Sequence, residues 1–162
     1  MRIKNVLSIV AFVAAFGLST AFASLFISPN TAAAEAITDF ILQDYVNGDI
    51  RDEKIYDLHI NNPSDINSVA FADYAEATEG YVDDSSSMDA NDLPRDFQKA
   101  WQAHMKAWRN YSVFLNESAD ISGRTACSLR KFKSNENSLN REINRTWYEV
   151  LRVGRSYGAD VR

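Results

Sequence analysis

The chain has 162 residues, of which 46% are hydrophobic, and this is enough for one folded domain with its own core. Such a composition excludes a wholly disordered chain, and a single cysteine excludes an intrachain disulfide framework. The net charge of −5 is unevenly distributed: residues 35–94 hold fifteen acids and two basic residues, whereas residues 95–162 hold thirteen basic residues and seven acids. Either the two halves pack together and partly neutralise each other, or the acidic half faces away and binds a cation or a basic partner.

The N-terminus has the pattern of an export element. Arg2 and Lys4 precede a long uncharged run, which keeps the positive flank inside and sends the rest of the chain across the membrane. The A-x-A motif at residues 21–23 matches a cleavage site, yet the apolar run of about 22 residues is also long enough to span a bilayer. We predict that residues 1–30 are a signal peptide or a membrane anchor, and that residues 31–162 form an extracytoplasmic domain, periplasmic or secreted.

The first predicted helix begins at Thr31 and ends at Asn47-Gly48. Its apolar residues fall on one stripe, which consists of Ile37, Phe40, Ile41 and Tyr45. The spacing predicts that this stripe is buried and that Asp39 and Asp44 face outward.

A second acidic helix is predicted between Ser64, as its cap, and Val82. Residues 83–92 follow it and are the most polar part of the chain. Their carboxylates and hydroxyls suit calcium, but the segment lacks the glycine and the terminal glutamate of an EF-hand loop. We interpret it as a flexible, solvated connector, with calcium binding as the alternative.

The strongest helical pattern lies in residues 94–115. Aromatic and apolar residues recur there at spacings of four and three, in the order Phe97, Trp101, His104, Trp108, Tyr111 and Leu115. This spacing predicts the buried seam of a helix that is packed against a partner helix.

The final helix is predicted from Leu139 to Tyr157, with Gly158 as its stop. Residues 134–138 are interpreted as a break before it, and one long helix from about Thr125 is the alternative. This last helix is the expected partner of the aromatic seam. We therefore predict an all-α fold, a small bundle of about four helices behind an N-terminal signal or transmembrane helix.

Motifs of catalysis and metal binding are missing from the sequence. With two histidines and one cysteine it holds no H-E-x-x-H, no C-x-x-C and no glycine-rich phosphate loop. We predict a protein that is not an enzyme, with no cofactor, no metal and no nucleic-acid partner. Cys127 is interpreted as a small buried residue, and a thiol activated by its basic neighbours is the alternative.

His104 has two interpretations. It is either a core histidine bonded to a carboxylate of the last helix, from Glu142 or Glu149, or a titratable anchor in a tryptophan-lined cleft. The candidate interaction residues are Trp101, His104, Trp108, Tyr111, Trp147 and Glu149.

Two motifs resemble those of a known group of proteins. The pattern L-P-x-D-F-x-x-A-W-x-x-H-M-x-A-W begins at Leu93, and E-I-N-R-T-W-x-E-V-L-R begins at Glu142. Together they resemble small exported bacterial helical proteins, a resemblance that covers less than half of the chain and implies an envelope setting but no activity.

From these features we predict a non-enzymatic envelope protein, exported or membrane-anchored, that binds another envelope protein or an envelope component. The N-terminal segment would also hold it in the membrane if it stays uncleaved. A small-ligand receptor or an enzyme that uses the Trp/His cleft around His104 is the alternative.

Overall fold

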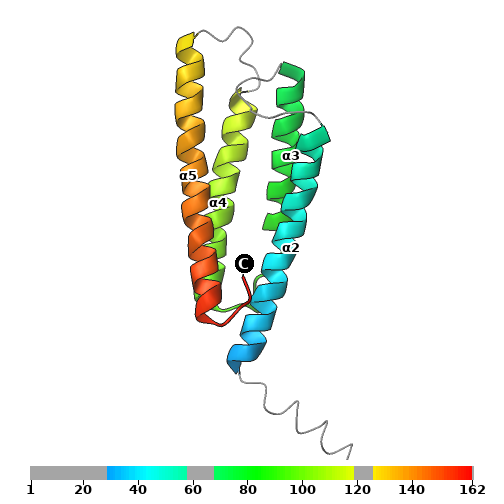
Figure 1. Ribbon diagram of the computed structural model, residues 1–162, viewed down its shortest axis with the longest axis vertical. Coiled ribbons are helices and arrows are strands. Elements are labelled where there is room, and N and C mark those ends of the chain that lie inside the picture. The colour runs from blue at the N-terminus through cyan, green and yellow to red at the C-terminus, as the bar shows by residue number, and fades with distance from the viewer. Residues whose placement is uncertain (1–28, 58–67, 119–125, 162) are drawn as a thin grey trace, which may run out of the picture.

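The computed structural model describes residues 29–57, 68–118 and 126–161, and this part of the chain forms four helices. They are α2 (Pro29–Asp57), α3 (Ser68–Ser86), α4 (Arg95–Ser118) and α5 (Ala126–Ser156), and successive helices run antiparallel (Figure 1). The predicted all-α bundle is therefore confirmed. None of the helices in the described segments is both long and apolar enough to cross a membrane. Residues 1–28, which make up most of the predicted signal peptide or anchor, lie outside those segments, as does Ser64, the predicted cap of the second helix.

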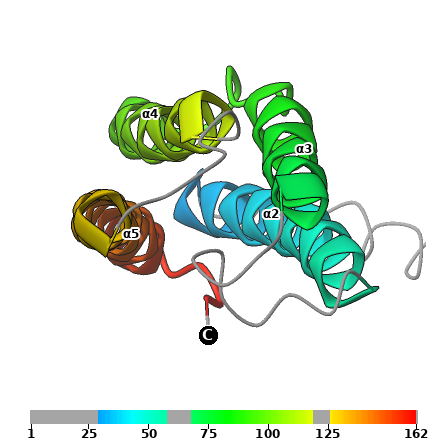
Figure 2. The same ribbon diagram turned by 90° about the horizontal axis from the view of Figure 1, so that it is seen from above.

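The helices pack in chain order. The most extensive contact is between α4 and α5, as the seam predicted, and the contacts of α3 with α2 and with α4 are similar to each other in extent. Contact between α2 and α5 is much smaller, because the two helices are close near the start of α2 and diverge toward their other ends (Figures 1 and 2). This divergence leaves one side of α2 without a neighbouring helix.

The core consists of two clusters of buried side chains. The first draws on all four helices and includes Ile37, Ile41 and Phe97. The second comes from α3, α4 and α5, and it is centred on Phe71 and Leu115. The predicted seam of α4 is confirmed, since its members are buried, apart from a half-buried Trp108 that touches both clusters. The apolar spacing of α4 thus places it at the centre of both clusters.

The structure corrects two predictions for α2. The helix continues through Gly48 to Asp57, and Asp44 faces inward with 5% of its surface exposed, whereas Tyr45 is 38% exposed. Asp44 is tolerated inside because its Oδ1 accepts hydrogen bonds from the hydroxyls of Tyr81, at 3.0 Å, and Ser85, at 2.7 Å. Hydrogen bonds from α3 therefore place Asp44 on the buried face of α2, where the apolar pattern had predicted Tyr45.

The connector after α3 is also shorter and better packed than predicted. α3 continues past Val82 to Ser86, and Ser85 is fully buried. Within the segment interpreted as solvated, Met88 and Ala90 pack against the first core cluster. Nowhere in the described residues do three His, Cys, Asp or Glu side chains gather as metal ligands.

α5 is one continuous helix, so the alternative of a single long helix is confirmed and the predicted break at residues 134–138 is wrong. Gly158 ends it as predicted, with a φ of 87°. The amide of Ala159 donates to the carbonyl of Gly154 at 3.1 Å, and that of Gly158 donates to Arg155 at 3.0 Å. These two bonds are those of a Schellman motif, which satisfies carbonyls at the end of a helix.

Cys127 is exposed, and its interpretation as a buried residue is wrong. The buried positions at this end of α5 are Phe132 and Glu136. Cys127 lies five residues before Phe132, off the face that these two residues share. The side chain therefore points away from the bundle.

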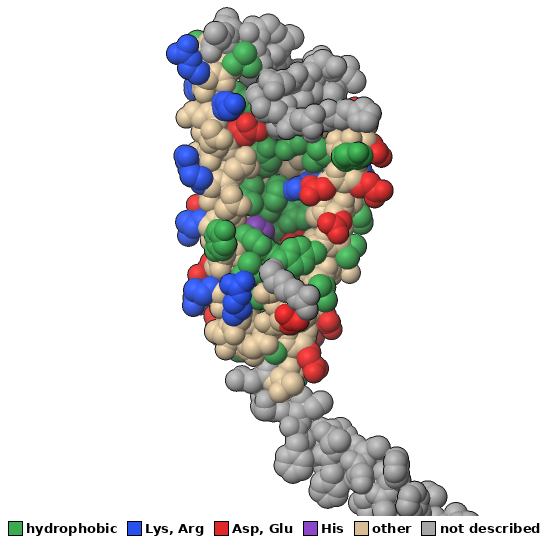
Figure 3. All heavy atoms as spheres, in the orientation of Figure 1, with side chains coloured by type: hydrophobic (Ala, Val, Ile, Leu, Met, Phe, Trp, Pro, Cys, Tyr) green, Lys and Arg blue, Asp and Glu red, His purple; other side chains and the backbone are tan. Residues whose placement is uncertain are grey.

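The two halves of opposite charge pack together through the apolar core. Acidic side chains gather along α2 and basic ones along α5, on opposite rims of the face shown in Figure 3. The ion pairs between described residues each join side chains of one helix: Arg51 with Asp52, Arg145 with Glu142, and Arg152 with Glu149. The acidic and the basic half of the chain therefore pack together, as the first alternative predicted. The ion pairs between described residues do not join one half to the other, however.

Candidate functional site

Three of the six predicted interaction residues meet at one cavity. His104 and Trp108 of α4 and Trp147 of α5 line a space of about 230 Å³ that opens between α2 and α5. In Figure 3 this hollow is visible between α2 and α5, and hydrophobic side chains gather in it. The structure thus forms an aromatic cleft around His104, as one of the two interpretations of this residue requires.

The other three predicted residues lie elsewhere. Trp101 is buried in the first core cluster. Tyr111 is buried as well, and its hydroxyl lies 3.1 Å from that of Tyr74. Glu149 forms an ion pair with Arg152 along the outside of α5. None of the three lines the cavity.

Both ring nitrogens of His104 are engaged. The indole N–H of Trp108 donates to Nε2 at 3.1 Å, and Nδ1 lies 3.0 Å from the hydroxyl oxygen of Thr146. Because an indole N–H is only a donor, Nε2 accepts and the proton of the neutral ring sits on Nδ1, from which it is donated to Thr146. The Thr146 hydroxyl in turn donates to the backbone of α5, where the carbonyls of Glu142 and Ile143 each lie at 2.9 Å.

The structure corrects the partner of His104. It is the hydroxyl of Thr146, and the predicted carboxylates of Glu142 and Glu149 are instead paired with arginines on α5. Burial lowers the pKa of His104 from 6.5 to about 4. A second ring proton would also point at the Trp108 N–H, so this geometry favours the neutral ring as well. His104 is therefore a neutral core group that forms part of the cavity floor.

A run of aromatic rings forms one wall of the cavity. The ring centres of Tyr45 and Trp147 are 5.7 Å apart, those of Trp147 and His104 are 5.0 Å apart, and those of Trp108 and Tyr81 are 4.7 Å apart. Two of these three contacts are edge-on, an arrangement that aromatic rings favour because their faces carry partial negative charge and their edges partial positive charge. This part of the lining is therefore rich in aromatic surface.

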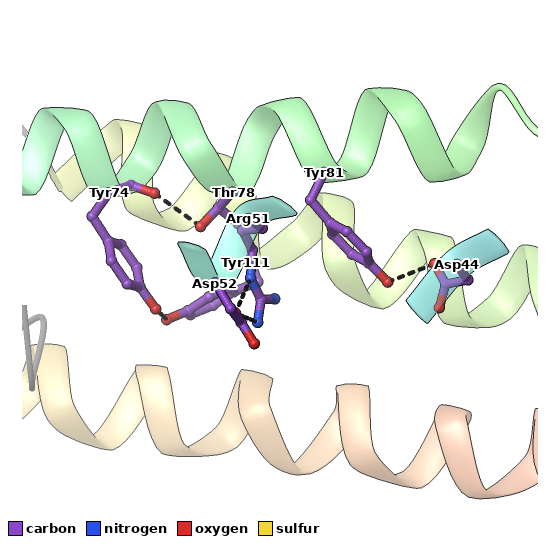
Figure 4. A network of polar contacts seen from close by, with 7 residues as sticks. All are labelled: Asp44, Arg51, Asp52, Tyr74, Thr78, Tyr81 and Tyr111. Atoms are coloured by element: carbon purple, nitrogen blue, oxygen red, sulfur yellow. Dashed lines mark hydrogen bonds and ion pairs between the residues drawn. The ribbon is translucent and has the colours of Figure 1, made fainter. Parts of the chain in front are cut away.

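α2 supplies the charged part of the lining. Besides Tyr45, which belongs to the aromatic run, its lining residues are Asp44, Gly48, Asp49, Arg51 and Asp52. The Arg51 guanidinium lies over the Trp108 ring, 4.7 Å from its centre. Its Nε donates to Oδ1 of Asp52 at 2.9 Å, and Figure 4 shows these two side chains. Burial raises the pKa of the Asp44 carboxyl, although its hydrogen bonds to Ser85 and Tyr81 oppose that shift.

Comparison with known proteins assigns no family to this site. No family model matches the chain, and no curated protein or solved structure matches it. Any function therefore has to follow from the cavity and the surfaces of the chain itself.

Sequence reasoning missed the residues that α2 brings to the cavity. Asp44 was predicted to face outward, and no contact was predicted for Arg51. One signal was present: Arg51 is one of two basic residues among fifteen acids in residues 35–94. A basic residue within a strongly acidic segment favours a specific electrostatic contact at that position.

A second surface feature lies on the outer side of α2. Three aliphatic side chains are exposed there at a spacing of four residues: Leu42 at 53%, Val46 at 49% and Ile50 at 44%. This spacing places them on one stripe, roughly opposite the buried Ile37 and Asp44. Exposed acids, Asp39 and Glu53 among them, lie on the same side of the helix.

Proposed function

We propose that this chain is a non-enzymatic envelope protein, exported or membrane-anchored, which binds another envelope protein through the outer side of α2. The observation that carries the proposal is the aliphatic stripe of Leu42, Val46 and Ile50, which the bundle does not use for its own core. Aligned apolar residues on one side of a helix are a common protein-binding surface. The charged N-terminal pattern and the resemblance to exported bacterial proteins support the location.

The state of His104 also supports a non-enzymatic role. A general acid or base needs a titratable atom within reach of its substrate. In His104 both nitrogens are held, by Trp108 and by Thr146. An enzyme that works through this histidine would first have to break one of these two bonds.

Site-specific photo-crosslinking in intact cells tests the proposal. The full-length protein carries a photoreactive amino acid at position 46, and in a control at position 113, where Val113 of α4 is equally exposed, at 50%. We expect one defined crosslinked protein from position 46 and none from position 113. Equal products from both positions, or no product from position 46, would contradict the proposal. The variant Val46→Lys should reduce crosslinking from position 42 at least fivefold.

A small-ligand receptor is a second candidate function, and the cavity is the specific observation in its favour. Four helices contribute to its lining, and His104, Trp108 and Trp147 come from the predicted cleft. Concave sites with aromatic walls and a few polar groups are typical of ligand binding.

A further inference from the structure

The cavity between α2 and α5 already holds one positive group of the protein. The central carbon of the Arg51 guanidinium lies 4.7 Å from the ring centre of Trp108 and 5.3 Å from that of Tyr81. Cations are attracted to aromatic faces at such distances, because the faces carry partial negative charge. The aromatic wall therefore already accommodates a planar organic cation.

The charge of the lining is negative. Its acids are Asp44, Asp49 and Asp52, its basic residue is Arg51, and His104 is neutral. Arg51 is committed to Asp52, which accepts hydrogen bonds from two nitrogens of the guanidinium. Asp44 and Asp49 therefore remain to face a ligand, and an anion would be repelled by both.

Asp44 has one oxygen available. Its hydrogen bonds from Tyr81 and Ser85 both reach Oδ1. Among the described residues, no buried side-chain oxygen or nitrogen lacks a partner. Because Asp44 lines the cavity and its Oδ2 makes no hydrogen bond with a described residue, we infer that this oxygen is accessible from the cavity.

The size of the cavity limits the ligand. Its volume of about 230 Å³ is smaller than the roughly 300–1,000 Å³ of sites for drug-sized molecules. One cationic head group with a short aliphatic stem suits this space better than a nucleotide or another large cofactor.

We propose that this cavity binds an organic cation, a guanidinium or alkylammonium group, between the aromatic wall and the carboxylates of Asp44 and Asp49. The inference rests on the second candidate function, a ligand receptor, and names the chemical class of its ligand. Arg51 then acts as an internal competitor, because its positive charge lies close to the place of the ligand's charge.

Titration of the full-length protein in a non-ionic detergent tests this proposal. The probes are n-butylguanidinium and n-butylammonium, with neutral n-butanol and anionic butyrate as controls. The indole N–H signals in NMR spectra report binding, since Trp108 and Trp147 line the cavity and Trp101 does not. We expect saturable shifts of the Trp108 and Trp147 signals with the two cations only. No saturable shift up to 50 mM, on the order of the weakest specific binding, would overturn the proposal.

Two glycines provide matched variants. A Cβ atom at Gly48 or at Gly80 meets no other atom within 4 Å, and only Gly48 lines the cavity. Gly48→Leu should fill the cavity and weaken cation binding at least tenfold, while Gly80→Leu should leave it unchanged within twofold. An equal loss in both variants would contradict binding in this cavity.

Arg51→Gln tests the competitor. Removing a positive charge close to the ligand should tighten cation binding about fivefold or more. Weaker cation binding by this variant would overturn the role of Arg51, because it would make the arginine part of the binding surface.

Further outcomes distinguish a protein from a small molecule as the source of the cation, and protein binding by α2 from ligand binding in the cavity. If acetyl-Gly-Arg-Gly-amide binds as tightly as n-butylguanidinium, the ligand is an arginine side chain of a protein; if only the free cations bind, it is a small molecule. Equal shifts with n-butanol would overturn the cation and leave the receptor function standing. Failure of crosslinking at position 46 would contradict protein binding by α2 and would leave cation binding untouched.

Discussion

His104 is held in one protonation state by two neighbours of different chemistry. Trp108 donates to one nitrogen and Thr146 accepts from the other, so the ring is satisfied only when it is neutral. Burial acts in the same direction, because it disfavours the charged ring. The residue therefore links the pH of the solution to the stability of the α4–α5 contact.

Lowering the pH should destabilise the fold through His104. Its pKa is about 4 in the folded protein and 6.5 when the ring is free in water, so between these values the unfolded chain binds a proton that the folded chain does not. The free energy of unfolding should therefore fall by about 2 kcal/mol between pH 7.5 and pH 5. Urea unfolding of the full-length protein at both pH values measures this loss.

The control is His104→Gln, which removes the titrating ring. Between pH 7.5 and pH 5, the free energy of unfolding of this variant should fall by about 2 kcal/mol less than that of the parent protein. Asp44 acts with the opposite sign, because burial raises the pKa of its carboxyl and the folded chain binds that proton first. Both proteins contain Asp44, so the difference between them isolates His104. The same pH dependence in both would contradict the prediction.

Thr146 should matter through its hydroxyl. Thr146→Val keeps the shape of the side chain but leaves the Nδ1 proton of His104 without an acceptor, which costs about 1–3 kcal/mol of unfolding free energy. Thr146→Ser keeps the hydroxyl and serves as the control, with an expected loss nearer to that of one methyl group, about 1 kcal/mol. Chemical denaturation at pH 7.5 compares the two, and a larger loss in the serine variant would argue against the hydrogen bond.

At the scale of the helices, α2 and α5 approach each other closely at a point where α5 has a glycine. A Cβ atom at Gly154 of α5 would lie 3.2 Å from a methyl carbon of Ile37 on α2. Beyond this point the helices diverge, and Gly48 has open space beside it in the cavity. The two glycines therefore mark the closed and the open end of the α2–α5 contact.

Substitution of these glycines should change stability in opposite directions. Gly48→Ala should raise the free energy of unfolding by about 0.5–1 kcal/mol, because alanine is the better helix former and meets no atom there. Gly154→Leu should lower it by about 1–3 kcal/mol, because the side chain is forced against Ile37. Urea unfolding measures both, and a stabilised leucine variant would show that α2 and α5 are not in contact there.

At the scale of the whole molecule, the bundle is tightly packed around α4 and loosely packed along the last turns of α2. Both core clusters contain residues of α4, whereas the last turns of α2, residues 49–57, bury no residue fully. Those turns carry Arg51 and two of the three acids of the cavity, Asp49 and Asp52. The proposed ligand site thus has one firm wall, from α3, α4 and α5, and one lightly packed wall.

Hydrogen exchange should reveal this difference. Amides of residues 50–57 should exchange at least tenfold faster than those of residues 100–111, since local opening needs less free energy where little apolar surface is buried. Mass spectrometry of deuterated peptides from the full-length protein measures both segments. Equal protection would mean that α2 opens only when the whole bundle unfolds.

The pattern of residues along the chain was enough to predict a bundle of about four helices, the seam of α4 and the pairing of α4 with α5. These features follow from the spacing of apolar residues along single helices, which is local information. Trp108, Trp147 and His104 were also recognised as a group, because aromatic residues on the facing seams of two helices must meet.

The partner of His104, the burial of Asp44 and the position of Arg51 became visible only in the folded bundle. Each depends on which side chain of another helix lies opposite, and no spacing within one helix contains that information. Asp44 looked exposed because carboxylates seldom lie inside without a partner, and its partners, Tyr81 and Ser85, are about forty residues away. The cavity is therefore a property of the assembled bundle, since all four helices contribute to its lining.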